Sequence, residues 1–458
     1  MASPLLDTPA DIIRSIFSSL GRRELVQLCL VNTDLRALAE PFLYATPIYW
    51  KWEASRTPPI VSLLRSIMRR PQLADFIQHV LLVGTLFERD QHQYRRESPK
   101  LVVAEEDLDA AIECIKGKDM PFGEAWIRET RSGTMDAFVA LLLSRLPRLK
   151  AFYIGENFTR ESRLVGMVLR SALCEHHPNL PRYEHLEDAA ATYFSLGIDL
   201  RRHTDIRNTA DVLALFYLPS VKRIRASLDN PDIFTWPAAQ PPSPSRLETL
   251  DLTMIREGNL GQVLSVTSGL KKLLWDWYYR PDLEDRFVTD AISLDRLASD
   301  LSHVRGTLTH LTITAATDMS RAEPDFPPVQ ITGNFNIFAN LNVLKRIEVP
   351  LPFLLGFSPW GSDRIRLAER LPPSIEVLTI TDDLYLQDEW MWRDVDLLQT
   401  LRLWLEDWRK TTPCLQKFHL LLKMMDYEDW GPEMRQELED LGTKVGIEIE
   451  ITKLAGSM

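Results

Sequence analysis

Nine short apolar triads with the spacing L-x-x-L-x-L recur along most of the chain. Each has the alternation of a half-buried strand, and most follow a helical segment that ends at a turn. So many copies exceed chance in a chain of this composition, so the chain is expected to fold as a series of repeats. The triads are Ile77-Val80-Leu82, Leu149-Phe152-Ile154, Val221-Ile224-Ala226, Leu247-Leu250-Leu252, Leu270-Leu273-Trp275, Leu308-Leu311-Ile313, Leu344-Ile347-Val349, Ile375-Leu378-Ile380 and Leu415-Phe418-Leu420.

A helix, a turn, a triad and a further helix are typical of a leucine-rich-repeat solenoid, with a parallel sheet inside and helices outside. We therefore predict an α/β fold, with an irregular leucine-rich-repeat-like solenoid over residues 60–458. The long gap between the first two triads predicts two helical segments, at 108–115 and 122–146. The chain is expected to close with a helix and the strand "GIEIEI", which together form a cap.

The segment before the first triad has helical periodicity instead. Apolar residues from Ile12 to Leu20 recur at spacings of one, three and four, which predicts a helix that begins near Thr8 and ends at Gly21. A second helix is predicted at 23–30. A third, capped by Asn32, should stop near Pro41. Three short helices bury little surface among themselves, so part of their apolar face is expected to bind another chain.

These residues also resemble a known motif. A proline, an acidic residue and two aliphatics, followed by Ile16, Leu20, Glu24-Leu25, Leu28 and "LVN", resemble the F-box. The continuation "LAEPFLYATPIYW" is similar to the form common in fungal F-box proteins. The resemblance implies a three-helix F-box at residues 4–50 that binds a Skp-type adaptor, and through it cullin, in an SCF ubiquitin ligase. It assigns adaptor binding to Pro9, Ile12, Ile13, Ile16, Leu20, Leu25 and Leu28.

Composition excludes several other partners and locations. The 53 basic and 64 acidic residues give a net charge of −11, which argues against nucleic acid and anionic membrane as main partners. The four cysteines are far apart, without a CxxC pair, which indicates a reducing compartment and no zinc framework. The sequence has no apolar run of membrane-spanning length and no expected signal peptide. We therefore expect a cytoplasmic or nuclear location.

Catalytic and cofactor motifs are missing from the sequence. It contains no G-x-S-x-G, P-loop, dinucleotide-binding or H-E-x-x-H motif. The histidines of "CEHH" (174–177) point in different directions on a helix and are more consistent with a helix end than with a metal site. We therefore expect a non-enzymatic protein without a cofactor or a metal.

Repeat phase predicts where a target protein would bind. Side chains between the core positions of the triads should face the open side of the sheet, in a row formed by Tyr153, Arg225, Asp251, Leu274, Thr312, Glu348, Thr379 and His419. A loop after one strand is predicted to carry Trp277, Tyr278, Tyr279 and Arg280, which are residue types enriched at binding hot spots. We predict that these four residues, with Arg225 and Asp251, bind the substrate. The alternative is that the rings pack beneath the loop as core.

Three functions therefore stay open. The first is a substrate-recognition subunit of an SCF-type ubiquitin ligase, with the F-box bound to the adaptor and the solenoid bound to an unknown target protein. The second is a leucine-rich-repeat scaffold that binds protein partners without a role in ubiquitination, its N-terminal helices serving only as a cap. The third is an undetected enzyme, for which no residues are found.

Overall fold

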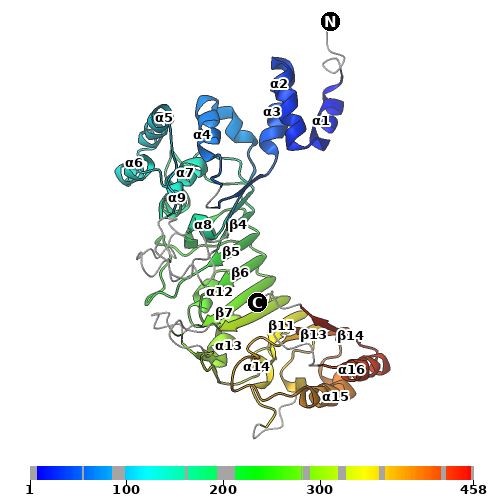
Figure 1. The fold of residues 1–458 in the computed structure, drawn as a ribbon. Helices are drawn as coiled ribbons and strands as arrows, with labels where there is room; N and C mark the ends of the chain where they lie inside the picture. Colours follow the sequence, from blue (N-terminus) through cyan, green and yellow to red (C-terminus); the bar gives the residue numbers. More distant parts are fainter. Residues whose placement is uncertain are drawn as a thin grey trace. The chain divides into compact units, whose positions relative to one another are not determined.

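A computed structural model describes residues 8–53, 56–84, 98–159, 163–192, 212–279, 281, 289–317, 326–360, 367–423 and 430–454. The chain divides into two compact units. Figure 1 shows the helices and strands that they contain. Unit 1 comprises Met1–Ile224 and Trp236–Pro244, and unit 2 comprises Arg225–Thr235 and Ser245–Met458. Each unit contains parallel strands and helices, and each is described separately below.

Unit 1 begins with three helices, which are α1 (Ala10–Ser19), α2 (Arg22–Val31) and α3 (Thr33–Ala45). Their caps follow from local chemistry, since Asn32 Oδ1 accepts the backbone N–H of Leu35 at 2.8 Å. The Glu24 carboxylate likewise accepts the N–H of Gly21 at 2.6 Å. Helix α1 starts after Pro9, and the cap predicted at Thr8 is not its N-cap.

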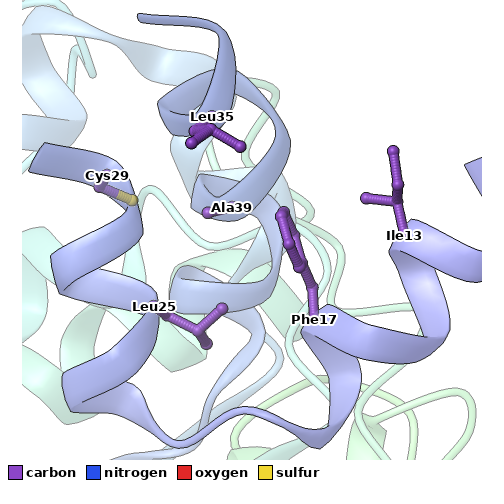
Figure 2. Close-up of a cluster of buried hydrophobic side chains, with 6 residues drawn as sticks. All are labelled: Ile13, Phe17, Leu25, Cys29, Leu35 and Ala39. Atoms are coloured by element: carbon purple, nitrogen blue, oxygen red, sulfur yellow. The ribbon is translucent and has the colours of Figure 1, made fainter. Parts of the chain in front are cut away.

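A small core holds these helices together. Figure 2 shows its six buried side chains, two from each helix, which are Ile13, Phe17, Leu25, Cys29, Leu35 and Ala39. The predicted stop of the third helix near Pro41 is wrong, because α3 continues to Ala45. A proline removes only its own N–H donor, and the extra turn places Phe42 and Leu43 against the core. Packing therefore outweighs the local preference of proline.

The rest of unit 1 alternates helices with four parallel strands paired in the order β1, β2, β3, β4. Two helices replace the one predicted at 122–146, because Gly133 adopts φ +72° between them and turns the chain. The elements are β1 (Ile48–Lys51), α4 (Ile60–Arg69), η1 (Pro71–Phe76), β2 (His79–Val83), α5 (Glu105–Lys116), α6 (Gly123–Arg131), α7 (Met135–Leu143), β3 (Ala151–Ile154), α8 (Glu156–Thr159), α9 (Arg163–Leu173), β4 (Asp188–Ala191) and η2 (Leu213–Tyr217).

Unit 2 contains parallel strands hydrogen-bonded in the order β6, β7, β9, β11, β12, β13, β14, and a separate pair of β8 and β10. Strand β5 (Arg223–Ser227) includes the boundary between the units. The further elements are β6 (Thr249–Thr253), α12 (Leu260–Leu264), β7 (Lys272–Tyr279), β8 (Ala291–Ser293), α13 (Leu294–Ser302), β9 (His310–Thr317), β10 (Gln330–Thr332), β11 (Arg346–Pro350), α14 (Leu351–Leu355), η3 (Leu367–Glu369), β12 (Val377–Thr381), α15 (Asp394–Thr411), β13 (Lys417–Leu422), α16 (Pro432–Val445) and β14 (Glu448–Lys453).

The nine predicted triads are confirmed as the strand core of both units. The second and third residue of every triad lie in a strand, and all triad residues are at most 3% exposed. The closing helix and strand are confirmed as α16 and β14. Strand β4 was not predicted, because its core positions are Ala189 and Ala191 rather than larger aliphatics. Alanine is too weakly apolar to stand out in a pattern of large aliphatic residues, although Ala189 and Ala191 occupy the same repeat positions as those residues.

Among the described helices, none combines the length and apolarity that a bilayer crossing requires. The longest, α15, carries acidic residues in its first turn and basic residues in its last.

Candidate functional site

The open face of the unit 2 sheet is a row of side chains in register across neighbouring strands. Parallel pairing aligns one residue each from β6, β7, β9, β11, β12 and β13, which are Asp251, Leu274, Thr312, Glu348, Thr379 and His419. The predicted alignment is therefore confirmed for these six residues. Because side chains alternate along a strand, residues two positions further on, such as Asp276 and Thr314, face the same side.

A cavity of about 220 Å³ lies where strands β7, β9, β12 and β13 end. Its polar lining comprises Asp276, Thr314, Thr317, Asp383, Gln387 and Lys423. Its apolar lining includes Ala315, Ala316, Leu384 and Leu386. Leu386 is 42% exposed, so the cavity reaches the surface.

Asp276 is the most perturbed acid in this lining. Its carboxylate accepts a hydrogen bond from the Thr314 hydroxyl at 2.7 Å. Burial raises the pKa of Asp276 to about 6, and the Thr314 hydrogen bond is the largest opposing effect; the charges of Asp383 and Asp251 raise the pKa by smaller amounts, and Lys423 lowers it least. Within the described residues no cation forms an ion pair with Asp276. The site therefore contains a carboxylate that is costly to ionise without a partner.

Asp383 and Lys423 form an ion pair beside it. The Lys423 ammonium lies 3.1 Å from one Asp383 oxygen, and the backbone N–H of Ala315 donates to the other at 3.1 Å. The same ammonium lies 3.8 Å from Glu348 on the open face. Burial raises the pKa of Asp383, while Lys423 opposes the shift. The positive charge of Lys423 is therefore already engaged by Asp383 and Glu348.

Gln387 provides a further acceptor among the lining residues. The residue is 4% exposed, and its amide nitrogen donates to Thr317 Oγ1 at 2.9 Å. The amide oxygen is buried without a hydrogen-bond partner. If the amide were turned over, its nitrogen would be the unpartnered atom instead, so either assignment leaves one polar atom unsatisfied.

The sequence did not identify these cavity residues as a site. Asp276, Asp383 and Lys423 are far apart in the chain and match no motif. The available signal was repeat phase, since Asp276 lies two residues after Leu274 in the predicted row. Only the turn that follows β12 brings Asp383 and Gln387 to the same place.

The aromatic residues predicted to lie in a loop belong instead to the end of strand β7. Strand β7 extends to Tyr279, because its pairing with β9 continues as far as Thr317, so Trp277, Tyr278 and Tyr279 belong to a strand rather than to a loop. Trp277 is fully buried and Tyr278 is 6% exposed, whereas Tyr279 is half-buried. Arg280 lies outside the described residues. Its role, and those of the three aromatic residues in target binding, stay predictions.

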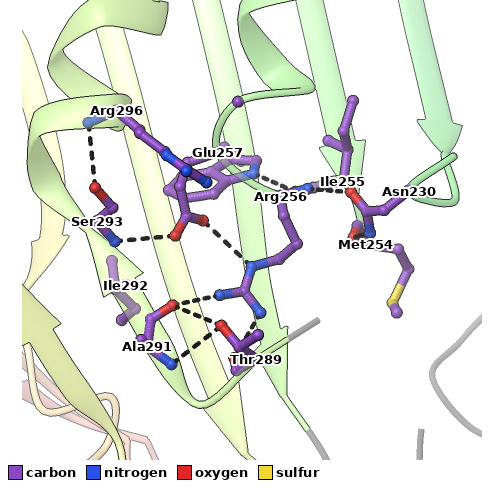
Figure 3. A network of polar contacts seen from close by, with 12 residues as sticks. Asn230, Met254, Ile255, Arg256, Glu257, Thr289, Ala291, Ile292, Ser293 and Arg296 are labelled. Carbon is purple, nitrogen blue, oxygen red and sulfur yellow. Dashed lines mark hydrogen bonds and ion pairs between the residues drawn. The ribbon is translucent and has the colours of Figure 1, made fainter. Parts of the chain in front are cut away.

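Trp277 packs under a buried arginine that the sequence did not single out. The Arg256 guanidinium lies 4.6 Å from the centre of the Trp277 ring. Figure 3 shows this guanidinium donating to the carbonyl oxygens of Thr289 (2.9 Å) and Ala291 (2.8 Å) and contacting Glu257 at 3.2 Å. Arg256 therefore holds the segment that leads into β8. Trp277 packs against this arginine, so its environment is that of a residue of the protein core.

Arg225 and Asp251 are brought together by the neighbouring strands β5 and β6. Their side chains form an ion pair at 2.6 Å between Nε and Oδ2. The Arg225 side chain is 49% exposed and that of Asp251 is 16% exposed. Since Asp251 contributes to the raised pKa of Asp276, this pair adjoins the charges of the cavity on the open face.

The predicted adaptor-binding residues of unit 1 fall into three groups. Ile13 and Leu25 are buried in the core of Figure 2, and Leu20 and Leu28 pack at its edge. Pro9 is exposed at the start of α1. Ile12 and Ile16 are 51% and 39% exposed, so they are the members of the set that present apolar surface to solvent.

Helix α2 adds apolar surface that the predicted set omitted. Its exposed residues are Val26 (37%), Leu30 (66%) and Val31 (64%). The resemblance to the motif did not assign these positions, although the triplet "LVN" includes two of them.

A comparison with protein-family models matches residues 54–458 to the family described as leucine-rich repeat domain. The chain belongs to this family. As a leucine-rich repeat domain, this part of the chain is suited to binding protein partners, because such repeats present extended surfaces along their strands. The match begins after the three N-terminal helices, which stay outside it. A comparison with curated proteins finds no match to the chain.

Proposed function

We propose that this protein is the substrate-recognition subunit of an SCF-type ubiquitin ligase. In this proposal, α1–α3 act as an F-box of the kind found in fungal proteins and bind a Skp-type adaptor, which connects them to cullin. The leucine-rich repeats hold a target protein. The chain itself carries no catalytic residue and no cofactor, and it works in the cytoplasm or the nucleus.

The observation that carries the proposal is the apolar surface of the first two helices. The described residues include fifteen exposed large hydrophobic side chains, and five of them lie between Ile12 and Val31. Exposed large apolar side chains are candidates for contact with another protein, and a third of those in the described residues belong to these two helices. They contribute nothing to the core of the three helices, which is formed by other residues. We therefore infer that these five residues contact another protein.

The packing of α3 against the following residues supports a partner-binding role for α1 and α2. Helix α3 contacts η1, and the Arg70 guanidinium donates to the Glu40 carboxylate at 2.7 Å. The attachment of the helices to the following repeats thus uses α3. Exposed apolar residues of α1 and α2 are left for a partner.

The proposed mechanism is proximity. A receptor that holds its target near a ubiquitin-charged enzyme replaces a bimolecular encounter with a local one, which raises the effective concentration of a target lysine. The receptor needs only two binding surfaces for this purpose. One is on α1 and α2, and the other is on the repeats.

The test is co-purification of the full chain with a Skp-type adaptor. The variant Ile12→Asp/Ile16→Asp replaces two exposed side chains, so the fold should be kept, as checked by circular dichroism. Buried anchors at an interface centre contribute ~2 kcal/mol or more each, so we expect adaptor capture to be lost. The matched control is Val395→Asp/Leu403→Asp, which changes two exposed apolar residues of α15 (54% and 60%) and should leave capture intact.

Two outcomes would contradict the proposal. The first is failure of the wild-type chain to capture the adaptor, which would favour a leucine-rich-repeat scaffold that binds partners without ubiquitination. The second is capture at the wild-type level by the Ile12→Asp/Ile16→Asp variant, which would remove the interface from α1.

A further inference from the structure

We propose that the cavity at the ends of β7, β9, β12 and β13 binds a positively charged side chain, lysine or arginine, of a protein target. The inference deepens the proposed function, on which it rests for the identity of the ligand as part of a target. The binding site itself is argued from unit 2 alone.

The first argument is the charge balance of the cavity. Two carboxylates, Asp276 and Asp383, line it together with one cation, Lys423. Lys423 lies against Asp383 and near Glu348, whereas Asp276 has the Thr314 hydroxyl as its hydrogen-bond donor. Asp251 on β6 also raises the pKa of Asp276, although its own carboxylate is paired with Arg225 at 2.6 Å. A cation next to Asp276 would supply the missing partner of a largely buried carboxylate.

The second argument is the shape and lining of the cavity. At about 220 Å³ it is smaller than the ~300–1,000 Å³ of a typical cofactor or drug-sized ligand site, so it suits a single side chain. Ala315, Ala316 and Leu384 give it apolar walls. Lysine and arginine place their methylene stems along apolar surface and their charged ends at polar groups. The Tyr385 side chain adds an aromatic ring to the lining.

The third argument is independent of the acidic groups. Gln387 is 96% buried and lines the same cavity, yet one polar atom of its amide has no hydrogen-bond partner. An unsatisfied buried polar atom is rare in a folded protein and costs stability. In a ligand-bound state this amide would be available to polar atoms of the target beside the charged side chain.

The experiment compares three short peptides that differ at one central position, which is arginine, lysine or citrulline. Citrulline has nearly the shape of arginine without its charge. Binding of each peptide to the purified full chain, without any adaptor, is measured by ligand-observed NMR titration. We expect arginine or lysine to bind about tenfold or more tightly than citrulline, because only a charged side chain can form a charge-assisted hydrogen bond with Asp276. The ratio of arginine to lysine affinity distinguishes the two side chains.

Two variants connect the binding to this cavity. Asp276→Asn keeps the size of the side chain and an oxygen for Thr314, and it should remove the preference for the charged peptides. Asp388→Asn changes an exposed carboxylate in the turn after β12, outside the cavity lining, and should leave the preference unchanged. Equal binding of the arginine and citrulline peptides, no binding of any charged peptide, or an unchanged preference in Asp276→Asn would overturn the inference.

The outcome is separable from the proposed function. Loss of adaptor capture with intact peptide selectivity would refute the ubiquitin ligase role and leave the cavity proposal standing. The reverse result would refute the cavity proposal alone.

Discussion

Replacing Asp276 by asparagine should change how the stability of the protein depends on pH. The pKa of this carboxyl is raised from 3.8 to about 6 in the folded state, mainly because the group is buried among other acids. One pH unit of displacement corresponds to ~1.4 kcal/mol, so the difference amounts to ~3 kcal/mol between the protonated and the ionised form.

The sign follows from the raised pKa. The folded state holds the proton more tightly than the unfolded chain, so the stabilisation it gives is complete below pH 3.8 and is lost as the pH rises through about 6. Above pH 7 the wild-type chain carries the full cost of the buried charge. The groups that face Asp276 are Asp251, Thr314, Asp383 and Lys423. The variant keeps all four and loses the titrating group.

The assay is urea unfolding of wild type and Asp276→Asn between pH 4 and pH 8, followed by circular dichroism. The free energy of unfolding of the variant relative to wild type should rise by ~2.5 kcal/mol across this range, most of it between pH 4 and pH 7. Asp388→Asn, on an exposed carboxylate, should show no comparable trend. A stability difference between Asp276→Asn and wild type that stays constant with pH would refute the reasoning.

Two further predictions concern stability. Arg256→Ala should lower the free energy of unfolding by ~3–5 kcal/mol in urea unfolding, because it leaves the buried Glu257 carboxylate with the Ser293 N–H but without its ion-pair partner, and removes the donors to Thr289 and Ala291 (Figure 3). A loss below ~1 kcal/mol would show that the network contributes little. Gly442→Ala should lower the melting temperature, since its Cβ would clash with Ile449 and lie 2.8 Å from the Ile447 carbonyl oxygen, at a cost of ~1–3 kcal/mol. Gly306→Ala, where a Cβ meets nothing within 4 Å, is the control, and equal melting of the two variants would contradict the clash.

The length of β7 could not be predicted from the sequence. The triad that ends at Trp275 predicts the strand, yet the strand runs four residues further, because β9 is equally long and continues to pair with it. Strand length depends on the partner strand, which a local pattern does not contain. Trp277 and Tyr278 are consequently buried, although their sequence position suggested a loop.

The candidate site was predictable only in part. Repeat phase predicted the open-face row through Asp251 and Leu274, because parallel strands of equal phase align the same positions. It could not predict that Asp383 reaches across to the backbone of Ala315, which belongs to a strand two places away in the sheet. That contact depends on the path of the turn after β12.

The sequence by itself determined the repeat architecture of this protein, because period-two alternation and helical periodicity are local properties that each segment expresses independently of its neighbours. It also placed the apolar residues of the N-terminal helices, although not the division between those in the core, such as Ile13, and those in solvent, such as Ile12. Only the tertiary structure determines which charged side chains lie close together. Asp276, on β7, and Asp383, in the turn after β12, are close because the sheet and the path of that turn bring them together. Their effect on each other depends on burial and distance, which are properties of the folded chain.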